Sequence, residues 1–167
     1  MVEVYNNRGQ TYALLGDLTL ATADFSRAIE LCTPTLGPRY LFVQALTLNH
    51  LGNALAETGN LVQGLVHFSR AIEIYSSAGF ADDGSLSDMA LAHNNRGQTL
   101  AELGRPEEAV GDFTTAIDLY TSVVEERGFV EFRDLLATAF FNRACARDSC
   151  SEKELAIEDL RHCLGIY

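Results

Sequence analysis

The 167-residue sequence contains no tryptophan and only one lysine, and none of its apolar stretches is long enough to cross a bilayer. Positive charge is scarce, because 12 Lys and Arg stand against 23 Asp and Glu and give a formal net charge of −11. Nucleic acids and anionic membrane surfaces are bound by clustered positive charge. We therefore expect no nucleic-acid partner and no membrane partner, and a protein or peptide partner that is neutral or basic.

Two further absences bear on the cellular compartment. Residues 1–8 lack the basic start and the apolar run of a signal peptide. Four cysteines in a chain of this size do not suggest a disulfide scaffold. We therefore expect a cytoplasmic protein. Its hydrophobic share of 47% and its length suit one ordinary domain with a real core.

The main positive signal is an internal repeat that occurs in four segments. Each segment predicts two helices, and the first has a small residue near its middle, which indicates close approach of a neighbouring helix. In three of the four segments this residue is a glycine, which costs helix propensity and so needs such a reason. These small residues are Gly9, Gly52, Gly97 and Ala144. In the first three segments a glycine seven residues later predicts the end of the helix: Gly16, Gly59 and Gly104.

The second helix of each segment is predicted by a small–large–small order at spacings of four and three, which fall on one helical face. The four examples are Ala21–Phe25–Ala28, Gly64–Phe68–Ala71, Ala109–Phe113–Ala116 and Ala156–Leu160–Cys163. The small residues leave room for the first helix, and the large residue fills the gap. An antiparallel helix pair with a short turn follows, four times over.

The repeats are long. From Gly9 to Gly52 the spacing is 43 residues, then 45 to Gly97, then 47 to Ala144, and the extra residues read as helical. We expect a single domain, 1–167, with repeats at about 2–33, 39–78, 85–127 and 131–167. Two further helix starts are predicted by capping spacings, Ser85 with Asp88 and Ser151 with Glu154.

Two positions change together along the chain. Repeats one, three and four have an arginine just before the small residue and an aspartate just before the large apolar residue: Arg8 with Asp24, Arg96 with Asp112, and Arg143 with Asp159. Repeat two has neither, and carries Leu51 and His67 instead. Because Arg–carboxylate geometry suits a partly buried bidentate pair, we predict a structural ion pair in each of those three units. Ligand-binding arginines are the alternative.

This pattern resembles the tetratricopeptide repeat over nearly the whole chain, although that repeat usually has 34 residues. In their length the repeats are similar to those of kinesin light chains and of Pins-type spindle-orientation scaffolds. The resemblance implies an all-α fold, a right-handed superhelix (solenoid) of four antiparallel helix pairs. It also implies a non-catalytic protein–protein interaction module that binds an extended peptide in its concave groove, which the first helix of each pair lines.

The resemblance also assigns the residues that would face such a groove. They carry side-chain amides, which both donate and accept hydrogen bonds and so suit a peptide backbone: Asn6, Gln10, Asn49, Asn53, Asn94 and Gln98. Ala13, Ala56 and Ala101 would leave room for ligand side chains, and Glu57 and Glu102 would make one wall acidic and favour a basic segment. A merely solvated face is the alternative. A clamp for the C-terminal carboxylate of chaperones is not expected, because basic residues are missing from the matching positions.

Catalytic chemistry has no support in the sequence. No phosphate-binding glycine loop, G-x-S-x-G or H-E-x-x-H motif occurs, so we expect neither an enzyme nor a cofactor. Cys145, Cys150, His162 and Cys163 do not have the usual spacing of zinc ligands. Cys163 stands at the position of Ala28 and is explained by core packing, since a free cysteine behaves as a small apolar residue.

The end of the last repeat leaves two alternatives open. The chain stops at Tyr167 without the polar capping helix that repeat proteins usually have. Either the chain belongs to a longer protein, or another subunit covers an apolar face formed by Leu155, Ile157, Leu164, Ile166 and Tyr167. A homodimer through the terminal apolar faces is therefore expected as one option. The alternatives to a peptide groove are a self-assembling scaffold and an interaction domain of a larger regulator.

Overall fold

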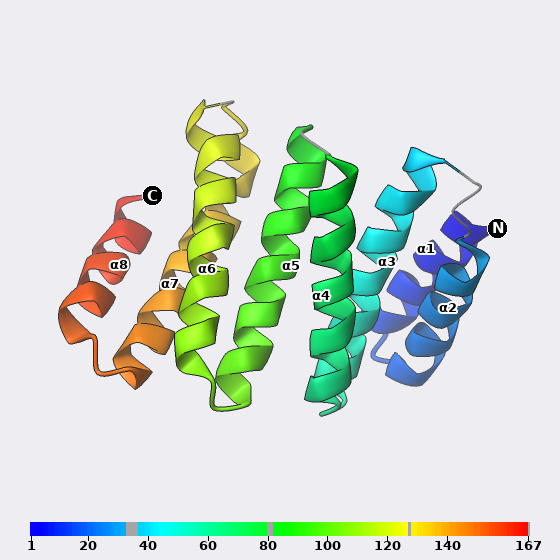
Figure 1. The fold of residues 1–167 in the computed structure, drawn as a ribbon, viewed down its shortest axis with the longest axis horizontal. Coiled ribbons are helices and arrows are strands. Elements are labelled where there is room, and N and C mark those ends of the chain that lie inside the picture. Colours follow the sequence, from blue (N-terminus) through cyan, green and yellow to red (C-terminus); the bar gives the residue numbers. More distant parts are fainter. Residues whose placement is uncertain (33–36, 80–81, 127, 167) are drawn as a thin grey trace. The chain divides into compact units, whose positions relative to one another are not determined.

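The computed structural model describes residues 1–32, 37–79, 82–126 and 128–166, and within these ranges the chain forms helices and no strand. The helices form two compact units, Met1–Phe80 and Ala81–Tyr167. Each unit holds two antiparallel helix pairs joined by short turns (Figure 1). The all-α prediction is confirmed.

Unit 1 contains the first two pairs. Its helices are α1 (Val2–Leu14), α2 (Leu18–Leu31), α3 (Pro38–Glu57) and α4 (Leu61–Ala78). Helix α3 packs against α2 as well as against its own partner α4, so that the two pairs share one core. That core includes Ala21 and Phe25 of α2 and Leu51 and Ala54 of α3.

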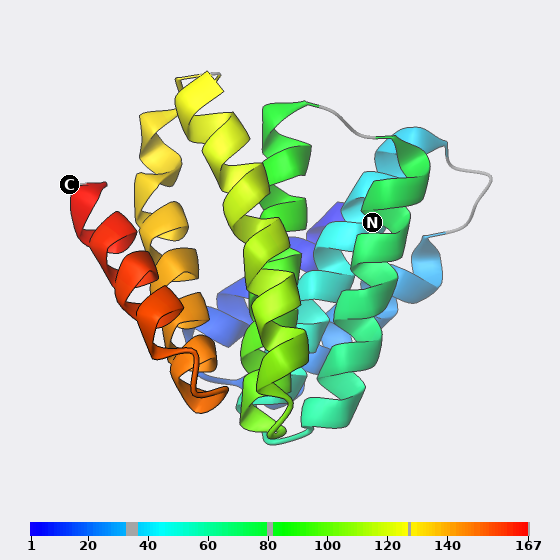
Figure 2. The same ribbon diagram turned by 60° about the vertical axis from the view of Figure 1, so that its left-hand side comes forward.

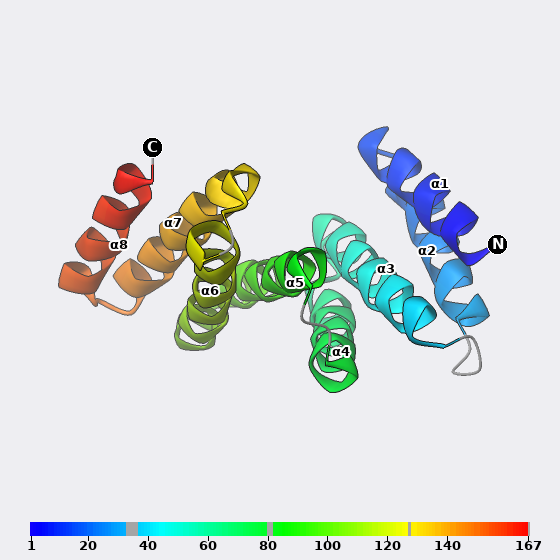
Figure 3. The same cartoon turned by 90° about the horizontal axis from the view of Figure 1, so that it is seen from above.

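Unit 2 repeats this plan with longer connections. Its elements are α5 (Asp83–Glu102), α6 (Pro106–Thr121), a π-helical segment η2 (Ser122–Glu126), a short 3-10 helix η3 (Val130–Phe132), α7 (Arg133–Ser149) and α8 (Lys153–Gly165). Helices α6 and α7 lie side by side (Figures 2 and 3). Their shared core includes Ala116, Ile117 and Tyr120 of α6 with Leu136 and Ala139 of α7.

The turns between paired helices use a left-handed backbone. Gly16, Gly59 and Gly104 have φ of 79°, 81° and 73°, as expected for glycines that end helices. In the fourth pair Ser151 takes this place with φ of 64°. The predicted capping box at Ser151 is therefore wrong, because the serine belongs to the preceding turn and Glu152 is the N-cap of α8.

The start of α5 also differs from the prediction. Asp82 caps the helix by accepting a hydrogen bond from the backbone N–H of Ser85 at 3.0 Å. Helix α5 therefore begins two residues before Ser85, which lies inside it rather than capping it. An acidic side chain is well suited to this place, because it satisfies an otherwise unpaired N–H and faces the positive end of the helix dipole.

The mid-helix glycines are explained by ring packing. A Cβ atom placed on Gly9 would lie 2.7 Å from the ring of Phe25, and one on Gly97 would lie 2.8 Å from the ring of Phe113. The predicted close approach is thus confirmed, and its cause is the phenylalanine of the paired helix. The fourth pair changes both positions together and has Ala144 with Leu160.

The three predicted Arg–Asp pairs are confirmed, and each joins the two helices of one pair. Arg8 donates to Asp24 through Nε at 2.6 Å and Nη2 at 2.7 Å. Arg96 binds Asp112 at 2.7 and 2.6 Å. Arg143 binds Asp159 at 3.0 and 2.7 Å. The aspartates are buried, which supports the structural interpretation over ligand-binding arginines.

Candidate functional site

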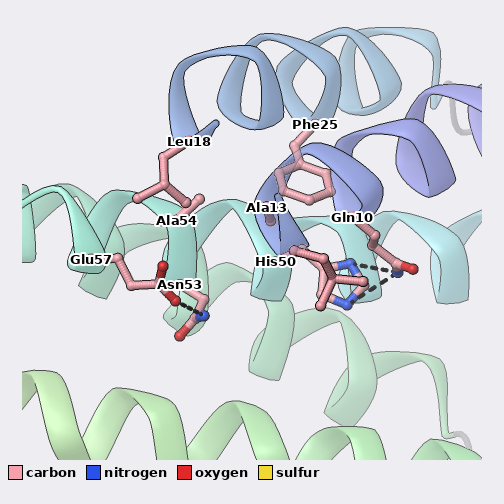
Figure 4. A pocket seen from close by; sticks show the side chains of 9 residues that line it. Gln10, Ala13, Leu18, Phe25, His50, Asn53, Ala54 and Glu57 are labelled. Carbon is pink, nitrogen blue, oxygen red and sulfur yellow. Dashed lines mark hydrogen bonds between the residues drawn. The ribbon is translucent and has the colours of Figure 1, made fainter. Parts of the chain in front are cut away.

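A hollow opens in unit 1 where α1, α2 and α3 meet, and we name it the unit-1 hollow (Figure 4). Its volume is about 250 Å³, and its lining is mostly apolar with a few polar groups. It is lined by Gln10, Ala13, Leu14, Leu18, Phe25, His50, Asn53, Ala54 and Glu57. A concave, mainly apolar site with a few fixed polar groups is the usual form of a side-chain-binding pocket.

Gln10 and His50 are held together at one side of the unit-1 hollow. The Gln10 amide nitrogen lies 3.3 Å from His50 Nε2, and His50 Nδ1 lies 3.2 Å from the Asn6 carbonyl oxygen. The same Gln10 nitrogen lies 3.1 Å from His50 Nδ1, so it faces the ring edge between the two nitrogens. When Nδ1 carries the proton, it donates to Asn6, and Nε2 accepts from Gln10. Burial lowers the pKa of His50 to about 4, so the ring is neutral at physiological pH.

The opposite side of the unit-1 hollow carries the acidic group that the sequence predicted. Asn53 donates a hydrogen bond to Glu57 at 2.8 Å, one helical turn further along α3 (Figure 4). Both side chains are exposed. The pair therefore presents a carboxylate and an amide to any ligand that enters the hollow.

An equivalent hollow, the unit-2 hollow, lies between α5, α6 and α7 in unit 2. Its volume is about 330 Å³. It is lined by Gln98, Ala101, Glu102, Phe113, Asn142, Cys145, Ala146 and Ser149. In the repeat register Gln98, Ala101 and Phe113 correspond to Gln10, Ala13 and Phe25, so the two units carry the same construction at the same place.

The six amides that were predicted to face a groove fall into two groups. Gln10 and Asn53 come together in the unit-1 hollow, and Gln98 lines the unit-2 hollow. The other three are buried in the helix packing: Asn6, Asn49 and Asn94, with exposed fractions of 4%, 1% and 7%.

The buried amides hold adjacent pairs together. Asn6 accepts a hydrogen bond from the Thr47 hydroxyl at 3.0 Å, which ties α1 to α3. Asn94 accepts one from the amide of Asn142 at 3.1 Å, which ties α5 to α7. A buried amide is costly unless it is hydrogen-bonded, so these contacts fix the spacing of the helices that shape each hollow.

Two lining features were not anticipated from the sequence. The floor of the unit-1 hollow is built from Phe25 and Ala54 rather than from alanines of one helix alone, and His50 forms part of its wall. Ala56 instead packs beside Gly64, where a Cβ on the glycine would meet it at 3.6 Å. One sequence position could have indicated these lining residues, namely the one two places before the small residue of the first helix. His50 and Asn142 both stand at that position, and both line a hollow.

The charged groups in both hollows are acidic. Each contains a glutamate, and no lysine or arginine is among the residues that line them. In the part of the chain that the structure describes, no three His, Cys, Asp or Glu side chains gather to hold a metal ion. Within the same ranges, no helix combines the length and apolar character that a membrane span needs.

Comparisons with solved structures place this fold among helical repeat proteins. The crystal structure of the apo form of RapI matches 99% of this chain with a TM-score of 0.83 and 15% identity. Only 55% of RapI is covered, so the chain spans little more than half of that length. MamA matches with a TM-score of 0.67 and 16% identity, over 99% of this chain and 77% of its own. BtubC from P. vanneervenii matches with a TM-score of 0.57 and 12% identity, over 99% of this chain and 79% of its own.

Family models decide the classification. No curated protein matches the sequence. Two models described as tetratricopeptide repeat match residues 43–122 and 2–33, and together they cover well over half of the chain. The matched segments contain the Gly–Phe pairs of the first three repeats and two of the three Arg–Asp pairs. The chain therefore belongs to the tetratricopeptide repeat family.

Proposed function

We propose that this protein is an interaction module that binds extended peptide segments of a partner protein, one in the unit-1 hollow and one in the unit-2 hollow. The observation that carries the proposal is their equivalence: each offers a glutamine, an alanine and a phenylalanine floor at matching places, and each adds a glutamate, Glu57 from α3 in the unit-1 hollow and Glu102 from α5 in the unit-2 hollow. A mainly apolar hollow with a glutamine and a glutamate beside it suits an extended segment that places one side chain in it and aligns its backbone with the amide. Interaction through protein partners is also what the family and the fold support.

Of the six predicted ligand residues, we assign direct contact to the three that line the hollows. Gln10, Asn53 and Gln98 would hydrogen-bond the peptide backbone. Asn6, Asn49 and Asn94 would act by holding the helices at the distance that keeps the hollows open. The glutamates, Glu57 and Glu102, would favour a lysine or arginine whose apolar stem lies against the phenylalanine floor.

The test is a peptide-display selection against the purified protein, followed by affinity measurement for enriched peptides. The binding variant is Glu57→Gln/Glu102→Gln, which keeps shape and removes charge. The control is Asp118→Asn/Glu158→Gln, which changes two exposed acids that line neither hollow. We expect basic peptides to be enriched, and the binding variant to weaken them about fivefold while the control does not, as two partly solvated charge contacts predict. No enrichment, or equal loss in both variants, would refute the groove.

A peptide groove is not the only function that the chain supports. Self-assembly through apolar ends is favoured by a separate set of exposed residues, which lie on α1, α7 and α8. The set consists of Val4 of α1, Phe141 of α7 and Ile157, Leu160 and Leu164 of α8, and none of the five lines the unit-1 hollow or the unit-2 hollow. The two functions can therefore be tested independently.

A further inference from the structure

The last helix pair leaves an open apolar surface, which we name the α7–α8 hollow. Its volume is about 500 Å³, and it is lined by Phe141, Ala144, Cys145, Asp148, Lys153, Ala156, Ile157 and Leu160. Phe141, Ile157 and Leu160 are 51%, 50% and 40% exposed, and nearby Leu164 is 78% exposed. Such a group of large apolar side chains in contact with water marks an interaction surface.

The other pairs show what this surface is shaped to receive. In the repeat register, Ala156 and Leu160 of α8 correspond to Ala21 and Phe25 of α2. Phe25 is only 1% exposed, because Leu51 and Ala54 of α3 pack against it. In unit 2, α7 covers α6 in the same way. The α7–α8 hollow is therefore built to accept the first helix of another pair.

The face of α1 that corresponds to these covering helices is itself exposed. In α3 the residues that contact the preceding pair include Thr47, His50, Leu51 and Ala54; in α7 they include Ala139, Asn142 and Arg143. The α3 set maps onto Val4, Asn7, Arg8 and Thr11 of α1, and the α7 set maps onto the first three of these. All four are exposed, and Val4 is 60% exposed although it is apolar.

The polarity of the two free surfaces matches in a way that the internal contacts do not. Inside unit 1, Asn6 of the first pair meets Thr47 of the next helix through a hydrogen bond. At the free end, the position of Asn6 is taken by Phe141, and the position of Thr47 is taken by Val4. A polar contact has thus become a potential apolar contact on both sides at once. The apolar Val4 on α1 and the apolar Phe141 on α7 would therefore suit each other as contact partners.

We propose that α1 of a second copy of this chain packs into the α7–α8 hollow, with Val4 against Phe141. The contact joins two different surfaces, so it is heterologous and leaves a free surface at each end. Each copy carries both surfaces, so the contact adds copies head to tail until the ends close on each other in a ring. Arg8, held by its own Asp24, would lie over Leu160 with its aliphatic stem, as Leu51 lies over Phe25.

Arg161 of α8 would oppose this contact, and replacing it should strengthen self-association. Inside unit 2, Arg143 donates to the hydroxyl of Thr114 at 3.1 Å. In the proposed contact Arg8 takes the part of Arg143, and Arg161 stands where Thr114 would be. Two arginines would then approach each other and weaken the contact. Arg161→Thr should restore the internal arrangement and strengthen self-association.

The experiment is sedimentation velocity over a wide range of concentration, with far-UV circular dichroism as a check of folding. We expect the wild-type mass to grow with concentration beyond that of a dimer, and Arg161→Thr to reach the same mass at lower concentration. Val4→Glu and Phe141→Glu should each be monomeric but folded, because both residues are exposed. An equimolar mixture of the two should form dimers and nothing larger, since each variant keeps one intact surface.

The mixing step separates the proposal from its rivals. A symmetric dimer through α1 or through α8 alone would survive one of the two glutamate variants and would gain nothing from mixing. A wild-type protein that stays monomeric at every concentration would overturn the proposal and leave the hollow to a partner of another sequence. Variants that assemble as well as the wild type would also overturn it. Peptide binding by Glu57 and Glu102 is untouched by these changes, so failure here does not bear on the proposed groove.

Discussion

At the scale of single residues, the glycine at the repeated position of α1, α3 and α5 is paired with a phenylalanine ring on the facing helix. Gly97→Ala places a Cβ about 2.8 Å from the Phe113 ring, a distance that forces the ring or the helix to move. We expect a loss of about 1–3 kcal/mol in the free energy of unfolding, the usual cost of overpacking a core. Chemical denaturation monitored by circular dichroism measures it.

The fourth repeat supplies the rescue for this variant. It has Ala144 with Leu160, so Gly97→Ala/Phe113→Leu should recover part of the loss because the smaller side chain leaves room for the methyl group. Gly111→Ala is the matched control, since nothing lies within 4 Å of its Cβ position. That control should stabilise α6 by about 0.5–1 kcal/mol. Equal effects at Gly97 and Gly111 would disprove the packing explanation.

Asp88 is a carboxylate at a position that is apolar in two other repeats, where Val43 and Leu135 stand. Burial, with a smaller contribution from the charge of Asp82, raises the pKa of Asp88 to about 6. Its folded-state pKa lies above the unfolded value near 4, so the folded state binds the proton more tightly. The ionised Asp88 carboxylate therefore destabilises the folded state at pH 7 and above. This loss of stability decreases as the pH falls through 6 and the carboxylate takes up a proton.

The expected result is a pH-dependent gain from Asp88→Asn. The variant should be more stable than the wild type by about 2 kcal/mol at pH 8, and the difference should shrink towards pH 5. Urea denaturation at several pH values measures this. Asp118→Asn, which makes the same change at an exposed site on α6, is the matched control. A constant difference across the pH range would mean that Asp88 does not titrate as its surroundings require.

At the scale of helices, the Arg–Asp pairs differ in how deeply they are buried. The Asp159 side chain is 1% exposed and binds both Arg143 and Arg147, whose side chains are 12% and 16% exposed. The side chain of Arg8, in contrast, is 54% exposed beside Asp24. Removing the carboxylate charge therefore leaves two poorly solvated cations at the α7–α8 pair but one well-solvated cation at the α1–α2 pair.

Asp159→Asn should accordingly cost about 3 kcal/mol of stability, and Asp24→Asn about 1 kcal/mol. Thermal and urea denaturation of the two variants measures the difference. Arg27→Gln, which removes an exposed arginine that pairs with Glu30 within α2, should be nearly neutral and serves as the control. A larger loss at Asp24 than at Asp159 would contradict the ranking by burial.

The elements themselves could be predicted well from the sequence, and the helix starts less well. Periodicity and turn glycines predicted paired helices, because a small residue needs a close neighbour and a left-handed turn needs glycine. The caps predicted at Ser85 and Ser151 were wrong, because a serine followed three residues later by an acidic residue occurs inside helices and turns as well as at helix starts. The spacing alone does not tell these cases apart.

The candidate site was predicted in part for a related reason. Gln98 and Asn94 lie four residues apart on one face of α5, yet Gln98 is exposed while Asn94 is buried against α7. The helical period correctly predicts that the two residues share one face of α5. Which of them is exposed to water depends on where the neighbouring helix packs. In unit 1 the neighbouring helix is α3, and its residues His50 and Ala54 complete the unit-1 hollow. No pattern within the first repeat indicates them.

At the scale of the whole molecule, the negative charge is divided unequally between the two units. Residues 1–80 carry 6 acidic and 4 basic residues, whereas residues 81–167 carry 17 and 8. Self-repulsion destabilises a compact state, and salt screens it over about 10 Å at 0.1 M. Unit 2 therefore has more to gain from added salt than unit 1, even after its buried ion pairs, which are screened less, are taken into account.

Native-state hydrogen exchange, followed by mass spectrometry on peptides from each unit, tests this difference. Raising NaCl should slow exchange in α5, α6, α7 and α8 more than in α1, α2, α3 and α4. Sucrose is the control, because it stabilises through exclusion from the surface and should protect both units without regard to their charge. Equal protection of the two units by salt would mean that charge repulsion is not what limits the stability of unit 2. Protection confined to α1, α7 and α8, and present only at high protein concentration, would instead report the head-to-tail contact.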